Sequence, residues 1–538
     1  MKKLSLVDKG FLVSETKNTP MHVAGISLYT LPEGANEQEY LHSLAETLRT
    51  SETLLSPMGD RLKTGRLGLA GATYWEPDPE LDMDYHVRHS ALPKPGRYRE
   101  LFNLVSRLHS TLLDRSRPLW EMHLIEGLQN REFAVYTKTH HAAVDGARSI
   151  HISRSMLSSD PSHIMADSPL SLQSWERYKA ALQLGKSPEY GHGDLRNVSD
   201  MLKSSFDSST NIFRAVQGFA NAWRGDSELS VPHLKVPHSS LNTPINSSRR
   251  FVAQSWPFAR IRSMGKALGG TFNDAVLAMC AGALRQYLQT HAELPEDSLK
   301  AMVPVSLRQE GDLESGNAVA TISADLATNI SDPGERFRAI RRSVQAGKQY
   351  FAEMTPSEIE MVSLIMQTPA ILLMPMGLIS QLPPYNVTIS NVPGIRETMY
   401  WNGAKLTGSY PLSIVTDGMA MNITLVTNAE NVDFGIIACR SSVPQMQRFI
   451  DYMELALVDL EEAAGLVTAK QEAKAPAKRR APAKPKAKAR PKANPKPKPK
   501  AKTKAKTKAK TKAKTKAKVK PKATPKAKPK AKPRSAKK

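Results

Sequence analysis

The sequence predicts an α/β or α+β fold, because strand and helix patterns are mixed through residues 1 to about 465. Three observations carry this prediction: an alternating strand from Phe133, a capped apolar helix after Thr271, and a strand pair around residues 428–431. The chain has 538 residues and 40% hydrophobic side chains. It is therefore long enough for about two to four domains and a sizeable core.

The first of these strands ends at a pair of histidines. Residues 133–139 alternate, so that one face carries Phe133, Val135, Thr137 and Thr139. Continuing the alternation places His141 on this face and His140 on the other. Gly146 follows closely, and residues 147–157 have helical character. Two adjacent histidines are therefore predicted to end a strand, enter a turn and point in different directions.

The remaining elements follow in the second half of the chain. Thr271 and Asp274 form the Thr-x-x-Asp pattern of an N-terminal capping box. The helix after them carries apolar side chains at i+4 spacing: Val276, Cys280, Leu284 and Leu288. Three further elements are predicted: a strand at 320–326, a helix opened by Asp332-Pro333, and a β-hairpin of residues 423–427 and 432–437.

Changes in composition divide the chain into four segments. A polar stretch rich in Ser, Asp, Pro and Thr separates two regions of mixed strands and helices, and a lysine-rich segment ends the chain. The expected division is 1–185 for the first mixed region, 186–250 for the connection, 251–465 for the second mixed region, and 466–538 for the tail.

The net charge of +24 comes from the last eighth of the chain. Residues 470–538 hold 31 Lys or Arg and a single acid, Glu472, whereas residues 1–469 hold 44 basic and 50 acidic side chains, a net of −6. The basic excess therefore gives no reason to assign nucleic-acid binding to the body of the protein.

The tail is built almost wholly of Lys, Ala, Pro and Thr, and Ala-Lys-Thr-Lys repeats four times from 501 to 516. Such a composition cannot bury a core, so the tail is expected to be disordered on its own. From 470 onward it has no aromatic residue to stack on bases. A salt-sensitive polycation suits duplex DNA, RNA, polyphosphate or anionic lipid. The alternative is a solvated tail without a defined partner.

Cysteine content and hydrophobicity exclude several classes of protein. Two cysteines, Cys280 and Cys439, exclude a disulfide scaffold and a cysteine-rich zinc module, and they fit a reducing cytosol. The N-terminus lacks the apolar stretch of a signal peptide. The most apolar segment, 364–382, is interrupted by Gln and Pro and predicts no transmembrane helix. It is expected to be core helix and loop, or a Met/Leu surface that adapts to acyl chains or a membrane.

The chemistry is concentrated in His140-His141-Ala142-Ala143-Val144-Asp145-Gly146. An imidazole titrates near working pH, so it can take a proton from a hydroxyl or thiol that attacks a carbonyl group. A carboxylate four residues after His141 and a glycine that permits a tight turn complete the pattern. The alternatives are a satisfied pair of core histidines and a metal site. Metal is disfavoured, because adjacent strand residues diverge and no third ligand is evident.

This stretch is the His-His-x-x-x-Asp-Gly signature of the CoA-dependent acyltransferase superfamily, which includes chloramphenicol acetyltransferase and peptide-synthetase condensation domains. Residues 1 to about 462 resemble, more specifically, the bacterial wax ester synthase/diacylglycerol acyltransferases. Motifs in that family's order carry the resemblance: Asp8–Glu15, Pro20–Val23, Pro118–Glu121, Asn242, Arg249-Arg250, Gly269–Asp274, Pro304–Arg308, Gly316-Asn317 and Asn391–Gly394. Ile395 departs from the family, in which a second proline is common at that position.

The resemblance implies two lobes, each a mixed sheet with flanking helices, and an active-site tunnel between them. His141 would lie on the tunnel as the general base that deprotonates the acceptor hydroxyl. His140 would position it, and Asp145 would be an orienting carboxylate, ion-paired to an arginine that the sequence does not identify. Gly146 would form the turn.

The resemblance also implies supporting roles in the second lobe. Asn273, at a helix N-terminus, would stabilise the oxyanion or hold the histidine loop, and Asp274 would support it. Simple helix capping is the alternative for both. Pro118–Glu121 and Asn391–Gly394 are expected to be turns that maintain the fold.

The implied reaction uses acyl-CoA as the donor substrate and a long-chain alcohol or diacylglycerol as the acceptor, with no bound cofactor and no metal. A cytoplasmic protein attached peripherally to the inner membrane or to lipid inclusions is expected, because alcohol and product partition into lipid. Two alternatives stay open: a condensation-type enzyme with a carrier-tethered acyl donor, and a granule-organising or nucleoid-tethering protein that acts through its basic tail.

Overall fold

The computed structural model describes residues 2–50, 53–144, 146–165, 168, 170–184, 230, 236–306, 319–352, 354, 358–359, 362 and 379–466. The chain divides into two compact units, residues 1–473 and 474–538, and every described residue belongs to the first. The predictions for the tail, and for most of the connection and of segment 364–382, therefore lie outside the described residues.

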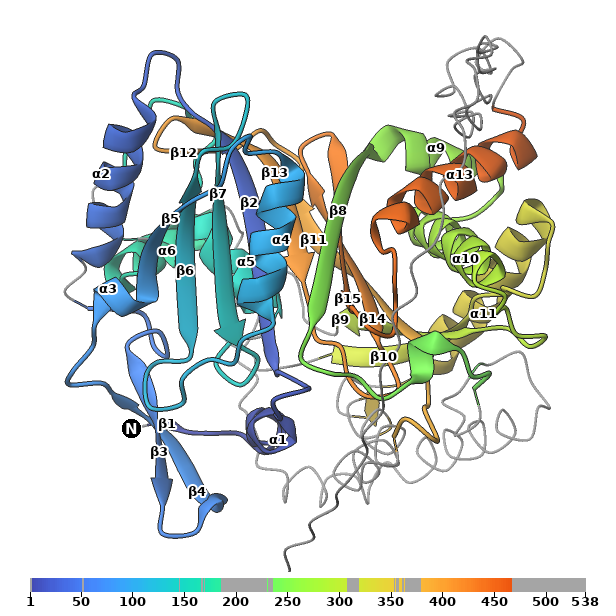
Figure 1. Cartoon of the computed structure of the whole chain (residues 1–538), viewed down its shortest axis with the longest axis horizontal. Helices are drawn as coiled ribbons and strands as arrows, with labels where there is room; N and C mark the ends of the chain where they lie inside the picture. The colour runs from blue at the N-terminus through green and yellow to red at the C-terminus, as the bar shows by residue number, and fades with distance from the viewer. Residues whose placement is uncertain are drawn as a thin grey trace, which may run out of the picture. The chain divides into compact units, whose positions relative to one another are not determined.

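Two six-stranded mixed sheets form the body of this unit (Figure 1). The first sheet has the order β12-β13-β2-β7-β6-β5, and its neighbouring strands are antiparallel except for β5 and β6. Its strands are β2 (His22–Thr30), β5 (Val87–Ala91), β6 (Trp120–Glu126), β7 (Glu132–His140), β12 (Tyr400–Trp401) and β13 (Ala404–Leu412).

The second sheet has the order β10-β9-β11-β14-β15-β8, and β11 runs parallel to both of its neighbours. Its strands are β8 (Arg249–Pro257), β9 (Lys300–Ser306), β10 (Val319–Asp325), β11 (Val387–Ile395), β14 (Met421–Asn428) and β15 (Asn431–Cys439). The described residues thus confirm the predicted mixed α/β fold with two sheet-based lobes.

Helices flank both sheets. Figure 1 shows α2 on the outer side of the first sheet and α9, α10, α11 and α13 on the outer side of the second. The helices are α2 (Glu37–Arg49), α3 (Met83–His86), α4 (Tyr98–His109), α5 (Gly146–Ser155), α6 (Leu172–Leu184), α9 (Phe258–Ala267), α10 (Phe272–Thr290), α11 (Pro333–Ala352) and α13 (Gln447–Ala463), with a 3-10 turn at Ser240–Asn242. Among the described residues no single helix has the length and hydropathy of a membrane span. By length and composition alone, α9 and α10 would pass as a pair bent by 96°.

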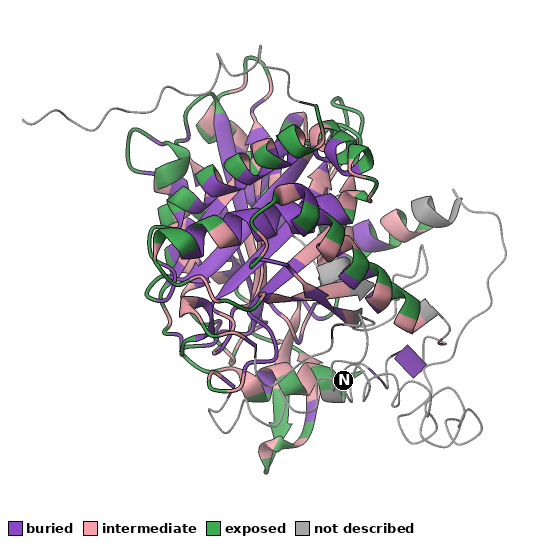
Figure 2. Ribbon diagram, turned by 90° about the vertical axis from the view of Figure 1, so that its right-hand side faces the viewer, coloured by how far each residue is buried: buried purple, intermediate pink, exposed green. Residues whose placement is uncertain are grey.

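One large apolar core joins the two sheets. It includes Tyr136 and Ile26 of the first sheet, Phe251 and Phe434 of the second, and Leu101 of α4. Figure 2 shows the buried residues concentrated in the sheets and the exposed residues on the outer faces of the helices. The two lobes are therefore packed around a shared interior.

A third, smaller sheet lies at the N-terminal end. It has the order β1-β4-β3, from β1 (Lys2–Lys3), β3 (Asp60–Gly65) and β4 (Gly68–Pro77), and helix α1 (Leu6–Ser14) packs against β4. Leu4, Leu12 and Trp75 are buried in a separate cluster there, which also holds Leu119 and Ala142 beside the histidine pair.

Two of the local predictions agree with these elements. β7 confirms the strand that ends at the histidines, and β14 and β15 confirm the predicted hairpin. Two expected turns were wrong. Trp120 and Glu121, in Pro118–Glu121, belong to β6, and Asn391–Gly394 lies inside β11. The strand bulges there, and the Gly394 backbone approaches the Thr427 carbonyl so closely that no side chain would fit.

The range expected for the second lobe, 251–465, needs one correction. β12 and β13 belong to the first sheet, where β13 pairs antiparallel with β2. The Tyr40 hydroxyl of α2 donates to the Trp401 carbonyl at 2.7 Å and fixes this crossing. β7 covers one edge of β2, and pairing with β13 covers the other edge, which would otherwise expose unpaired backbone groups.

Candidate active site

Strand β7 ends at His140, and His141 begins the tight turn that follows. In the sheet, His140 is paired with His22 of β2. The backbone N–H groups of His140 and His141 donate to the carbonyls of Leu119 and Met21, each at 2.9 Å. The backbone of the pair is therefore held on both sides, so the ring positions follow from the fold.

The His140 ring is fully buried, with a hydrogen bond at Nδ1 and a carboxylate near Nε2. Nδ1 accepts a hydrogen bond from the Ala142 N–H at 3.0 Å, so a neutral ring carries its proton on Nε2. Nε2 lies 3.4 Å from Glu15 Oε1. This arrangement leaves no lone pair for a substrate proton, which suits His140 to positioning rather than to base catalysis.

Glu15 is the anionic partner of His140. Burial raises the pKa of its carboxyl, but His140, the Met21 N–H at 3.1 Å and the Arg115 guanidinium at 2.9 Å outweigh burial and hold that pKa below its ordinary value. Glu15 is therefore ionised at neutral pH. It lies at the C-terminal end of α1, inside the first motif of the family resemblance.

The His141 ring is half-buried and stacks on Phe11 of α1, with ring centroids 4.1 Å apart and planes inclined by 17°. Stacking covers one face of the imidazole. Proton transfer uses the ring nitrogens, whose lone pair and N–H lie in the ring plane, so stacking and proton transfer are compatible. Phe11 and Glu15 lie one helical turn apart. A single N-terminal segment therefore contacts both histidines.

Two predicted site residues, Asp145 and Gly146, lie shortly after the histidine pair in the sequence. Asp145 lies outside the described residues, so its ion pair with an arginine stays a prediction. Gly146 is the first residue of α5. Arg154, in the last turn of α5, donates through Nη2 to the Gly394 carbonyl of β11 at 2.8 Å. The helix after the histidine turn is thus tied to the second sheet.

Asp274 forms the predicted capping box of α10. Its Oδ2 accepts from the N–H and from the hydroxyl of Thr271, both at 2.8 Å, and Thr271 Oγ1 accepts from the Asp274 N–H at 3.2 Å. This confirms the capping interpretation for Asp274, which is 3% exposed. Its other oxygen, Oδ1, has no hydrogen-bond partner among the described residues.

Asn273 faces a different neighbour. Its Oδ1 accepts from Asn391 Nδ2 of β11 at 2.6 Å, and an amide bonded in this way still has its own Nδ2 hydrogens to donate. Asn391 is three residues before Gly394, which α5 holds through Arg154. Asn273 and the histidine turn are thus connected through β11 and α5.

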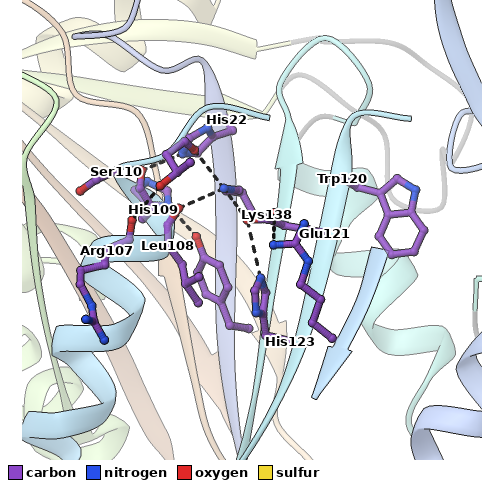
Figure 3. Close-up of polar contacts among 12 residues, drawn as sticks. His22, Arg107, Leu108, His109, Ser110, Trp120, Glu121, His123 and Lys138 are labelled. Carbon is purple, nitrogen blue, oxygen red and sulfur yellow. Dashed lines mark hydrogen bonds and ion pairs between the residues drawn. The ribbon is translucent and has the colours of Figure 1, made fainter. Parts of the chain in front are cut away.

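A buried charged network centres on Lys138 and Glu121 of the first sheet (Figure 3). Lys138, two residues before His140 on β7, has a fully buried side chain, and its Nζ lies 2.5 Å from Glu121 Oε1 of β6. The same Nζ donates to the carbonyls of Leu108 and Thr111, each at 3.0 Å. The lysine thus ties the strands β6 and β7 to the end of α4.

Protonation states in this network are set by burial and by Lys138. Burial raises the pKa of Glu121, but His123 and Lys138 outweigh it and bring that pKa to about 2. Burial, followed by the charge of Lys138, lowers the pKa of His109 to about 3, and the pKa of His22 is also well below its ordinary value. A neutral His22 donates through Nε2 to the His109 carbonyl at 2.9 Å. The network therefore combines the buried Lys138–Glu121 ion pair with two histidines, His22 and His109, that are neutral at pH 7.

Two other motifs have structural roles. Asn242 Nδ2 donates to the carbonyls of Tyr385 and Gly418, at 3.1 and 2.8 Å. Arg249 of β8 donates to the Asn18 carbonyl at 2.6 Å and so joins the second sheet to the N-terminal segment. Most of Pro304–Arg308 and all of Gly316-Asn317 lie outside the described side chains.

The sequence prediction did not include Phe11, Glu15, Arg115 or Lys138 as site residues. For Lys138 a signal existed, since the alternation places this lysine on the same strand face as Ala134, Tyr136 and His140. Within the described residues no group of three or more His, Cys, Asp or Glu side chains could hold a metal ion.

Two packed mixed sheets, with a histidine pair at the end of an inner strand, define the class of fold to which the chain belongs. The first condensation domain of the calcium-dependent antibiotic synthetase shares this fold. It matches with a TM-score of 0.50 and 14% identity, over 86% of this chain and 97% of that domain. At that identity the likeness shows the fold alone.

Comparisons at higher identity narrow the class. The wax ester synthase/diacylglycerol acyltransferase catalytic domain matches residues 4–276, and the WS/DGAT C-terminal domain matches residues 315–461. The O-acyltransferase WSD of Acinetobacter baylyi is 39% identical over 473 residues, covering 88% of this chain and 99% of that protein. The structure of the wax ester synthase/diacylglycerol acyltransferase from Marinobacter aquaeolei VT8 matches at 38% identity and a TM-score of 0.68, over 87% of this chain and 100% of that one.

This chain belongs to the wax ester synthase/diacylglycerol acyltransferase family, as the resemblance predicted. The predicted class of enzyme, an O-acyltransferase, is confirmed by the same matches.

Proposed function

We propose that this protein transfers a fatty acyl group from acyl-CoA to the hydroxyl group of a long-chain alcohol or of diacylglycerol, with His141 as the general base. Family membership supports the reaction class. The observation that carries the assignment of the base is the asymmetry of the histidine pair. His140 is fully buried, with Nδ1 bonded to the Ala142 N–H and Nε2 3.4 Å from Glu15, whereas His141 is half-buried and stacks on Phe11.

The proposed step balances without a covalent enzyme intermediate. His141 takes the hydroxyl proton as the alcohol oxygen attacks the thioester carbonyl carbon. The tetrahedral intermediate then collapses, the carbon–sulfur bond breaks, and the imidazolium returns its proton to the departing CoA thiolate. One ester and one free thiol form, and the histidine is restored. The protein needs no bound cofactor for this sequence.

Neighbouring groups set the conditions for that proton transfer. Glu15 and Arg115 fix His140, and His140 in turn fixes the turn that carries His141. We assign Asp145 the role of an orienting carboxylate and Asn273 that of a donor to the developing oxyanion or of a support for β11. Asn273 suits either role, because its amide bond to Asn391 leaves the Nδ2 group able to donate.

The environment of the enzyme is part of the proposal. Both acceptors and both ester products partition into lipid, which supports peripheral attachment to the inner membrane or to lipid inclusions. The tail supplies 31 basic side chains against one acid from residue 470 onward, and this charge supports a polyanionic partner such as anionic lipid, DNA or polyphosphate.

The test is thiol release from palmitoyl-CoA by purified full-length protein, with hexadecanol or diacylglycerol added. We expect acceptor-dependent release, and we expect His141→Ala to lower kcat by about 10²–10⁴-fold, the range for loss of a general base. His291→Ala is the matched control, since this histidine follows the last turn of α10 and its ring contacts the Tyr287 carbonyl through Nδ1.

Either of two results would contradict the proposal. Release that does not depend on an acceptor would indicate a thioesterase. No release with either acceptor would favour a carrier-tethered donor, as in the condensation domains, or a scaffold that acts through its tail.

A further inference from the structure

The outward face of α1 is apolar. Val7 is 54% exposed and Val13 is 57% exposed, and Gly10 lies between them on the same side of the helix, at i+3 from each. The opposite side carries Leu12, which is 1% exposed. A short surface helix normally turns its polar residues to water, whereas this helix exposes apolar residues on its solvent-facing side.

Another exposed apolar side chain lies on the β3–β4 hairpin, which α1 contacts. Leu67, in the turn between β3 and β4, is 76% exposed, the highest value among the large hydrophobic residues described as exposed. Figure 1 shows β3 and β4 reaching away from the body of the molecule. Most positions of these two strands are exposed or intermediate, and Thr73 and Trp75 of β4 are buried. Arg66, the neighbour of Leu67, is exposed as well.

Helix α1 and the hairpin form one unit. Lys9 of α1 donates to the Gly71 carbonyl of β4 at 2.8 Å, and the Leu4 N–H donates to the Thr73 carbonyl at 3.0 Å. Strand β1 pairs Lys2 and Lys3 with β4. We call residues 2–14 and 60–77 together the N-terminal face.

The N-terminal face has a charge opposite to that of the body. It contains six Lys or Arg and three Asp or Glu, a net of +3, whereas residues 1–469 as a whole carry a net of −6. Lys2, Lys3 and Arg66 are all exposed. Aliphatic side chains surrounded by exposed cations suit the boundary between anionic headgroups and acyl chains.

We propose that the N-terminal face docks on an anionic lipid surface, with Leu67, Val7 and Val13 entering the interfacial layer and Lys2, Lys3 and Arg66 meeting the headgroups. This inference rests on the proposed function, since lipid docking serves an enzyme whose acceptor lies in lipid. The face is joined to the chemistry by α1, because Phe11 of the same helix stacks on His141. A docked enzyme thus holds its general base one helix away from the lipid.

The first test reads insertion at single positions in the full-length protein. Leu67→Cys is labelled with an environment-sensitive fluorophore, and the two native cysteines are buried and 0% exposed. Leu455→Cys is the matched control, since Leu455 is 52% exposed on α13 of the second lobe. Vesicles of phosphatidylcholine with phosphatidylglycerol are added to each labelled protein.

We expect a several-fold rise in emission with a blue shift at position 67 and no change at position 455. Attachment through the tail alone would bring the protein to the vesicles and change neither probe, and that result would overturn the proposal. Equal changes at both positions would also overturn it. A shift at position 67 before vesicles are added would show that another part of the chain covers the face.

The second test separates docking from chemistry. Arg66→Glu/Leu67→Glu is expected to raise KM for diacylglycerol presented in anionic vesicles by about tenfold, which corresponds to ~1.4 kcal/mol. Its kcat/KM with a short-chain alcohol dispersed in water should stay unchanged. Leu455→Glu serves as the control. Equal loss with both acceptors, or no loss with either, would overturn docking, whereas a wild type inactive with both acceptors would overturn the proposed function instead.

Discussion

The two large sheets each bury a carboxylate, and the two carboxylates behave in opposite ways. Glu121 in the first sheet lies 2.5 Å from the buried Lys138 ammonium and has a pKa of about 2. Asp433 in the second sheet is 0% exposed, and burial raises its pKa to about 6. Its described partners are neutral donors: Ser255 Oγ at 2.6 Å, the Ser409 N–H at 2.7 Å and Asn428 Nδ2 at 2.9 Å.

The difference teaches that burial alone does not decide the charge of a carboxylate. Hydrogen bonds from neutral groups only partly offset desolvation at Asp433, whereas a cation and a histidine reverse it at Glu121. The first sheet therefore contains an ion pair, Lys138–Glu121, that stays charged at neutral pH and joins β6 to the strand that ends at His140. The second sheet keeps a carboxylate that gains a proton in mildly acidic conditions.

The largest effect is expected from breaking the ion pair. Glu121→Gln should lower the free energy of unfolding at pH 7 by about 3–5 kcal/mol, because it leaves the Lys138 ammonium buried without an anion. Urea denaturation measures this. The double variant Glu121→Gln/Lys138→Met should recover much of the loss, and a double variant as unstable as the single one would contradict the ion-pair interpretation.

The pH dependence of the same site has a definite sign. The folded pKa of Glu121, about 2, lies below its ordinary value of 4.5. Its contribution to stability is therefore present above pH 4.5 and is lost as the pH falls toward 2. Glu121→Gln should abolish that part of the acid dependence.

Asp433 should show the opposite dependence. Its folded pKa, about 6, exceeds the ordinary value of 3.8, so the folded state binds the proton more tightly and stability decreases as the pH rises from about 4 to 6. Asp433→Asn should therefore raise the free energy of unfolding at pH 8 by up to ~3 kcal/mol and give no gain at pH 4. Denaturation at both pH values measures this, and equal effects at the two would refute the assignment.

A smaller effect, on kcat, should distinguish a carboxylate beside the histidine pair from a carboxylate in the second lobe. Glu15→Gln is expected to lower kcat about tenfold (~1.4 kcal/mol), because His140 loses its anion while Gln keeps an acceptor oxygen. Glu454→Gln is the matched control, since Glu454 pairs with Arg260 at 2.9 Å in the second lobe. Steady-state kinetics should show no change in kcat for the control. A loss of stability in Glu15→Gln without any loss of kcat would make Glu15 purely structural.

The smallest effect is expected at the start of α10. Thr271→Ala removes the capping hydroxyl and should cost ~1 kcal/mol of stability with kcat within about twofold of the wild type. Asn273→Ala should instead reduce kcat and leave stability nearly unchanged. A reversed pattern would show that the capping box, rather than the amide beside it, serves the reaction.

The sequence was sufficient for elements whose signal is local. Alternation in residues 133–139 and the Thr271–Asp274 spacing depend on neighbours within one strand or one helical turn, and both predictions are confirmed. The motif at His140–Gly146 also led to the correct family.

What the sequence could not provide are contacts between distant segments. Phe11 and Glu15 meet the histidines across more than a hundred residues, and no local pattern marks that approach. The alternation in β7 places Lys138 on a buried face, but its partners, Glu121 of β6 and the carbonyl of Leu108 in α4, come from segments that are distant in the sequence. The role of Asp145 stays a prediction, since its side chain lies outside the described residues.

The crossing of β13 into the first sheet has a consequence for biosynthesis. The β2 edge that β13 completes leaves the ribosome early, and its partner strand is translated only after most of the body has been made. Until then the nascent first lobe carries an open strand edge, the kind of surface that pairs with other chains. The first lobe should therefore aggregate when it is expressed alone and recover when residues 236–466 are supplied as a separate polypeptide.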